Sequence, residues 1–115
     1  QETRTPAQIA YAELEKLKKA QYLEKGEIKK FYSRLGEIIK KFWGKTWQKN
    51  VLDMTTAEVL GTLQDTLDTQ TYRRAQKFLY ACDLVKFAKF RPTVEESIEL
   101  LEKAYRLVDE RRKSK

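Results

Sequence analysis

The sequence predicts an all-α domain of about five helices, with an optional small two-strand element of the winged-helix type. The chain of 115 residues has the length of one domain. Apolar residues recur at helical spacing in five segments, and helix-capping signals precede three of them. We expect a single domain over residues 1–115, with its core at residues 5–108 and a basic tail at residues 109–115.

The first two helices are the most clearly marked. Thr5 suits the N-cap of the first helix, and Pro6 suits its first turn. The second helix, expected over residues 27–43, has the strongest apolar periodicity in the chain. Gly36 within it indicates a close crossing by another helix, and Gly44 is placed to end it.

Three more helices are expected in the second half of the chain. An irregular segment, with a short extended piece at Val51–Met54, precedes a short helix that ends near Gln64. A longer helix begins near Thr69. Capping boxes start the short helix and the last helix: they pair Thr55 with Glu58, and Thr93 with Glu96. The last helix is expected to bury Ile98, Leu101, Ala104, Tyr105 and Val108.

The composition fits a folded, highly charged domain without the common catalytic groups. Apolar residues make up 41% of the chain and charged residues 36%, and there is one cysteine and no histidine. These counts exclude an internal disulfide framework, the usual zinc ligand sets and catalysis by a nucleophile–histidine pair. The carboxylates fit helix caps and solvated helix faces. We therefore expect neither an enzyme nor a cofactor or metal site.

The net charge of +7 is unevenly distributed along the chain. Residues 1–50 and 71–115 are basic, whereas residues 51–70 carry four acidic side chains and no basic one. A nucleic-acid-binding domain usually presents a continuous basic face to the phosphates. An acidic middle between two basic flanks disfavours that function.

The stretch "CDLVKFAKFRP", which begins at Cys82, is the least regular part of the pattern. Cys82 continues the apolar face of the preceding helix, which predicts a buried thiol. Residues 84–90 fit either the end of that helix or a short strand, and both remain open. Pro92 pushes Arg91 out of the helical conformation.

Two sets of residues near this stretch are candidate binding sites. The first is a partner-docking edge made of Lys86, Phe87, Lys89, Phe90 and Arg91. Its mixture of lysines and aromatics also fits a stacking platform for single-stranded nucleic acid, or core residues flanked by solvated lysines. The second set would contact DNA in a winged helix-turn-helix; it consists of Arg73, Arg74 and Lys77.

The two tryptophans add a further pair of alternatives. Trp43 and Trp47 have lysines around them in the sequence. Such residues fit contact with a membrane interface or a partner, and they equally fit packing in or beside the core.

Three segments in this order, "EIKKFYSRLGEIIKKF", "MTTAEVL" and "DLVKFAKFRP", carry a family resemblance. Together they resemble the cytoplasmic helical domain that follows a transmembrane helix in BatD-like proteins of Bacteroidetes, a domain of unknown function. The resemblance covers about residues 5–108. It departs from the family pattern at "WGKTWQKN", where the family has an "RFGI"-like turn.

The resemblance implies a non-catalytic interaction or adaptor domain of a membrane-anchored bacterial protein, held at the cytoplasmic face of the inner membrane by an anchor outside this chain. It implies a MoxR-type ATPase or a von Willebrand A protein as partner, and a loose link to aerotolerance. It supplies no catalytic residues. A winged-helix-like domain that binds nucleic acid is the alternative.

Overall fold

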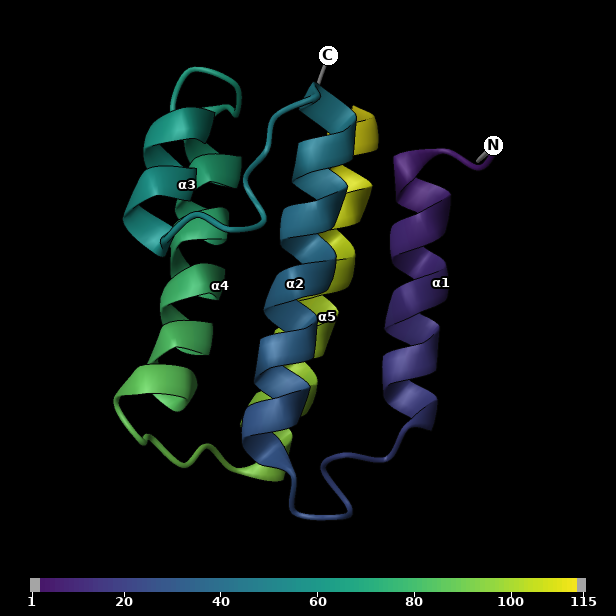
Figure 1. The fold of residues 1–115 in the computed structure, drawn as a ribbon, viewed down its shortest axis with the longest axis vertical. Helices are drawn as coiled ribbons and strands as arrows, with labels where there is room; N and C mark the ends of the chain where they lie inside the picture. The colour runs from purple at the N-terminus through teal and green to yellow at the C-terminus, as the bar shows by residue number, and fades with distance from the viewer. Residues whose placement is uncertain (1–2, 114–115) are drawn as a thin grey trace.

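The computed structural model describes residues 3–113, and they form five helices, which confirms the all-α class (Figure 1). The helices are α1 (Pro6–Lys19), α2 (Ile28–Trp47), α3 (Thr56–Leu63), α4 (Thr69–Phe87) and α5 (Val94–Lys113). Residues 3–113 contain no strand, so the optional two-strand element is wrong. Of the residues proposed for it, Val51–Met54 form a turn closed by a 3.1 Å hydrogen bond from the Met54 N–H to the Val51 carbonyl oxygen, and residues 84–90 form the last turn of α4 and the turn that follows.

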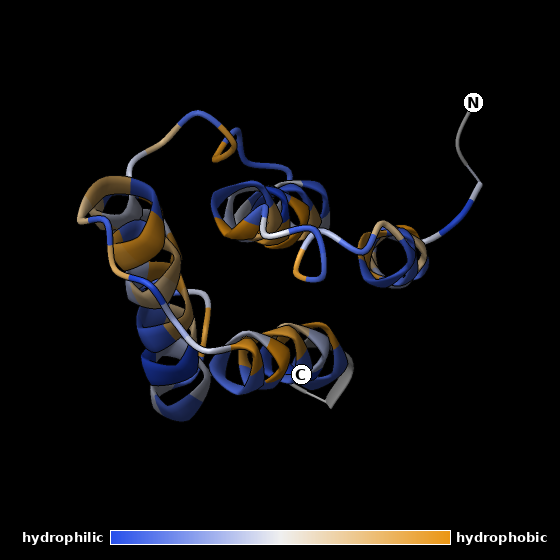
Figure 2. Cartoon of the chain, turned by 90° about the horizontal axis from the view of Figure 1, so that it is seen from below, coloured by the Kyte–Doolittle hydropathy of each residue, from blue (hydrophilic) through white to orange (hydrophobic). Residues whose placement is uncertain are grey.

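All five helices contribute buried residues to the core. Among the described residues α2 contacts α1, α4 and α5, and α5 also contacts α1 and α4. The short α3 contacts α4 alone, and it lies beside the upper, N-terminal half of α4 in Figure 1. Figure 2, which looks nearly along α2 and α5, shows their hydrophobic residues turned toward the space between the helices.

The predicted helix starts are confirmed because capping depends on neighbouring residues only. Each capping threonine accepts a hydrogen bond from the backbone N–H three residues later. The side chain of that third residue in turn accepts a hydrogen bond from the threonine N–H, which completes a capping box in all three cases. The bonds to the threonine hydroxyls measure 3.1 Å from Gln8 to Thr5, 3.2 Å from Glu58 to Thr55 and 3.0 Å from Glu96 to Thr93.

The predicted end of α2 at Gly44 is wrong, since the helix continues to Trp47. The chain reverses at Gln48, which has a left-handed φ of 54°. The N–H of Lys49 then donates to the carbonyl oxygen of Gly44 at 2.9 Å. A methyl group on Gly44 would lie 2.8 Å from the carbonyl oxygen of Lys49. This glycine therefore allows the returning chain to approach, and it does not end the helix.

The core is built around α2. Trp43 is buried, which settles its role as core packing, and Trp47 is half-buried. Ile98 was expected inside, but its side chain is 46% exposed. Ser97 is buried in its place and shares a 2.9 Å hydrogen bond with the hydroxyl of Tyr32. The buried residues of α2 are Phe31, Tyr32, Leu35, Gly36, Ile38, Ile39, Phe42 and Trp43.

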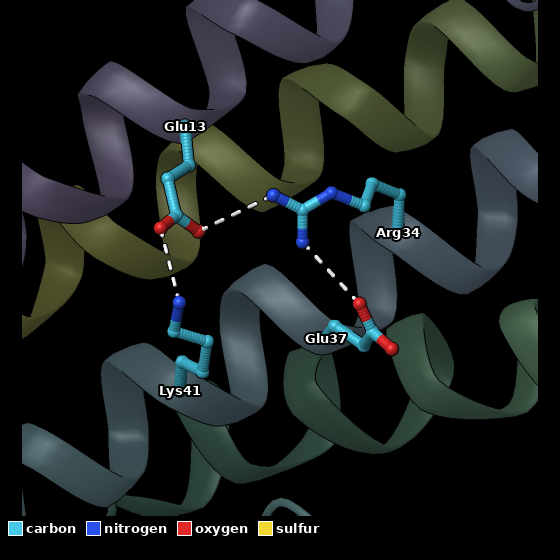
Figure 3. A network of polar contacts seen from close by, with 4 residues as sticks. All are labelled: Glu13, Arg34, Glu37 and Lys41. Carbon is cyan, nitrogen blue, oxygen red and sulfur yellow. Dashed lines mark hydrogen bonds and ion pairs between the residues drawn. The ribbon is translucent and has the colours of Figure 1, made fainter.

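Polar contacts fasten α1 to α2 (Figure 3). The carboxylate of Glu13 accepts a hydrogen bond from the Lys41 ammonium at 3.1 Å, and the Arg34 guanidinium lies 4.0 Å away. Arg34 also pairs with Glu37 of its own helix at 3.3 Å. The side chain of Glu13 is only 18% exposed, so this network is partly shielded from water.

Most of the segment predicted as a basic tail belongs to α5. Asp109 accepts a hydrogen bond from the hydroxyl of Tyr11 in α1, and Glu110 forms an ion pair with Arg74 in α4. These contacts fix the last turns of α5 against two neighbours. Residues 114–115 of the predicted tail lie outside the described residues.

The two glycines of α2 predict opposite effects of alanine on stability. A methyl group on Gly36 would lie 3.8 Å from the Cys82 sulfur, an ordinary contact. We expect Gly36→Ala to raise the free energy of unfolding by up to about 1 kcal/mol through better helix propensity. We expect Gly44→Ala to lower it by about 1–3 kcal/mol, because the added methyl overlaps backbone.

Urea unfolding of both variants beside the wild-type domain measures these changes. Equal shifts in the same direction for the two variants would contradict this account of Gly44.

Candidate functional site

The C-terminal end of α4 is closed by a hydrogen-bonded turn. Ala88 caps the helix, and Lys89 takes a left-handed conformation with a φ of 58°. The N–H groups of Ala88 and Phe90 both donate to the carbonyl oxygen of Leu84, at 3.1 and 3.0 Å. The chain therefore folds back over the last turn of α4 and holds Phe90 close to Leu84.

This turn brings the predicted docking edge together. The ring of Phe87 is 75% exposed and that of Phe90 is 47% exposed. Lys86 is half-buried, and its ammonium lies 5.1 Å from the centroid of the Phe87 ring. Lys89 and Arg91 are exposed on the same turn. All five predicted residues thus lie at one end of the domain, with aromatic rings beside basic groups.

A hollow opens next to this edge, between α4 and α5. It encloses about 210 Å³, and the exposed side chains of Leu84 and Phe90 reach into its lining. Tyr32 forms part of its inner wall, where its hydroxyl bonds to Ser97. Its lining also includes Pro92, Glu96, Glu99, Leu100 and Lys103.

The outer side of α4 carries exposed residues that the sequence analysis missed. Tyr80 is 50% exposed and Leu84 is 48% exposed, and both lie in line with Phe87. The spacing contained the signal for this placement, because once Cys82 and Val85 face the core, positions 80, 84 and 87 must face outward. We call this line the α4 stripe; it consists of Arg73, Lys77, Tyr80, Leu84 and Phe87.

The three residues proposed to contact DNA are not equivalent. Arg73 and Lys77 are exposed and lie on the α4 stripe. Arg74 points to the other side of the helix, where its guanidinium forms an ion pair with Glu110. Arg73 and Lys77 therefore share one face of α4 with part of the docking edge, whereas Arg74 is paired with α5.

Cys82 is buried, as predicted, with 3% of its surface exposed. It packs against Gly36, where α4 crosses α2. Burial away from water raises the pKa of the Cys82 thiol to about 12, because the thiolate would lose its hydration. At neutral pH this thiol is protonated and does not act as a nucleophile.

The raised pKa predicts a stability that falls at alkaline pH. The ordinary pKa of the thiol is 9.0, so above this value the unfolded chain loses a proton that the folded domain keeps up to about pH 12. We expect wild type to lose about 1 kcal/mol more stability than Cys82→Ala between pH 8.5 and pH 10. Urea unfolding of both proteins at each pH measures the difference, and parallel pH curves would contradict it.

Metal-ligand clusters and membrane-spanning helices are both absent from residues 3–113. No group of three or more aspartate, glutamate or cysteine residues there is placed to hold a metal ion. None of the described helices is both long enough and apolar enough to cross a membrane.

Comparison of the chain with protein-family models, curated proteins and solved structures found no match. The resemblance to BatD-like proteins therefore stays a prediction.

Proposed function

We propose that this domain is a non-catalytic interaction module that docks a protein partner on the α4 stripe and the turn after it. One observation carries the proposal: Tyr80, Leu84 and Phe87 are 50%, 48% and 75% exposed in line along one helix. Burying a large apolar side chain contributes roughly 1.5–3 kcal/mol. A partner that covers three of them in one contact gains enough to bind specifically.

The surroundings of these residues support a protein partner. Lys86, Lys89 and Arg91 lie around the exposed rings of Phe87 and Phe90. An apolar centre with a charged rim is the usual composition of a protein–protein interface. Arginine and aromatic residues are also those that contribute most to binding at such sites.

The family resemblance suggests the setting of this interaction. On its basis we propose an adaptor in a membrane-anchored bacterial protein, at the cytoplasmic face of the inner membrane. The partner would be a MoxR-type ATPase or a von Willebrand A protein, within a Bat-type assembly. This part of the proposal rests on the quoted sequence segments alone.

Nucleic-acid binding is the alternative function, and the exposure of Arg73 and Lys77 supports it. Three features weigh against it. Residues 3–113 provide no wing, Arg74 is engaged with Glu110, and the C-terminal half of the α4 stripe is apolar. Phosphates bind to basic groups that continue along a face, and a phosphate backbone gains nothing from Leu84 or Phe87.

Capture of the full-length, membrane-anchored protein from its native cells tests the proposal. The salt concentration should be about 150 mM, at which loose charge contacts are screened. We expect a MoxR-type ATPase or a von Willebrand A protein to be recovered. We expect Leu84→Gln/Phe87→Gln to reduce that recovery at least about tenfold, the loss that corresponds to 1.4 kcal/mol.

A matched control is available on α5. Val94 and Ile98 are 55% and 46% exposed, so Val94→Gln/Ile98→Gln removes comparable apolar surface elsewhere. This control should leave recovery unchanged. Recovery of nucleic acid alone, or of nothing, would contradict the proposed function.

A further inference from the structure

The α4 stripe has the spacing of a helix–helix seam. Its positions 73, 77, 80, 84 and 87 are separated by four and three residues in alternation, as in the a and d positions of a heptad. At 100° per residue they fall within roughly 80° of arc on the helix surface. All five side chains are exposed, so this seam has no partner within the described chain.

The seam is long enough for a second helix. From Arg73 to Phe87 it extends about 21 Å at 1.5 Å per residue, which matches four turns of a partner helix. Within residues 3–113, α4 packs against α2, α5 and α3, and α3 lies beside only its upper half in Figure 1. Ridges spaced by three and four residues fit the groove of another helix at a shallow crossing angle.

The hollow between α4 and α5 adds a pocket beside the seam. Leu84 belongs to both, and the lining of the hollow combines the apolar Phe90, Pro92 and Leu100 with the charged Glu96, Glu99 and Lys103. Its volume of about 210 Å³ accommodates one large apolar side chain. A helix lying on the α4 stripe can therefore insert one anchor between α4 and α5, as helices do in recognition grooves.

The charged residues near the α4 stripe indicate the charge of a partner helix. Arg73 and Lys77 lie at its N-terminal end, and neither forms an ion pair within residues 3–113. Lys89 and Arg91 lie beyond its C-terminal end. Among the described residues, Asp83 lies on α4 beside the stripe and Asp68 caps α4 before Arg73, and the hollow has Glu96, Glu99 and Lys103 on its α5 wall. Along α4 and the turn after it, the surface is thus basic at Arg73 and Lys77, apolar from Tyr80 to Phe87, and basic again at Lys89 and Arg91.

A second copy of the chain does not fit this charge pattern. A parallel pair of α4 stripes would set Arg73 against Arg73. An antiparallel pair would set Arg73 near Lys89 and Arg91 of the other copy. Both arrangements bring like charges together, which disfavours association.

We propose that the α4 stripe binds an amphipathic α-helix of a partner protein, with apolar residues at heptad spacing and carboxylates near both ends. The inference rests on the proposed interaction function and specifies the shape and charge of the partner. The apolar anchors cover Tyr80, Leu84 and Phe87, and one of them enters the hollow. The carboxylates pair with Arg73 and Lys77 at one end and with Lys89 and Arg91 at the other.

Selection from a displayed peptide library tests this inference without the native partner. The probe is a library of 21-residue peptides with leucine or isoleucine at heptad positions a and d, and glutamate or lysine elsewhere. We expect selection on the full chain to enrich glutamate near both peptide ends. Enrichment of lysine-rich peptides, or no enrichment, would overturn the proposal.

Two measurements on a selected peptide locate its binding site. In ¹⁵N spectra of the domain, we expect its largest shifts at residues 73–91. We expect Leu84→Gln/Phe87→Gln to weaken binding at least about tenfold, and Arg73→Glu/Lys77→Glu at least about fivefold. The charge-matched control Lys16→Glu/Lys29→Glu, at exposed positions of α1 and α2, should change it less than twofold.

Nucleic acid or a membrane bound at the α4 stripe would give a different result in a competition experiment. Binding of duplex DNA or anionic vesicles that competes with the peptide and is stronger than it would overturn the helix inference. Cellular capture separates this failure from failure of the proposed function. A captured ATPase or von Willebrand A partner that is insensitive to the α4 stripe variants would leave the function standing and remove the helix-binding site.

Discussion

The fold depends on the burial of α2 against three helices at once. Eight of its residues are buried, and it contacts α1, α4 and α5. No single neighbour can cover so wide an apolar surface, because two packed helices share only a narrow strip. Each of the three neighbours therefore needs only one apolar face. For α4, that face carries Ala75, Phe78, Leu79, Cys82 and Val85.

The α1 side and the α4 side of the domain differ in the contacts that their surface residues make. On the α1 side, Glu13 pairs with Lys41, and the rings of Tyr11 and Tyr105 stack with their centroids 6.1 Å apart. Polar groups therefore bridge α1 to α2, and stacked rings bridge α1 to α5. On the α4 side, α3 covers only part of the helix, and Leu84 and Phe87 remain in water. The proposed function assigns the partner to this exposed apolar surface of α4.

The sequence predicted what depends on neighbouring residues and missed what depends on distant ones. The capping boxes at Thr5, Thr55 and Thr93 are local, and all were predicted. The role of Gly44 depends on a chain that returns over it, and Arg74 is engaged by Glu110 from another helix. Neither contact has a signal in the local pattern. The outward position of Tyr80 and Leu84 did have one, since it follows from the inward face of the same helix.

The exposed residues of α4 contribute little to the stability of the domain itself. Phe87 is the last residue of its helix and is 75% exposed, so it buries little surface on folding. Surface residues of this kind usually change stability by less than about 0.5 kcal/mol when replaced. The core therefore does not require apolar residues at these exposed positions, whereas it does require them at Cys82 and Val85 on the opposite face. An apolar, heptad-spaced line on the outside of a stable helix has a physical explanation in a second helix that covers it, and the basic groups at its ends select a helix that carries acidic ones.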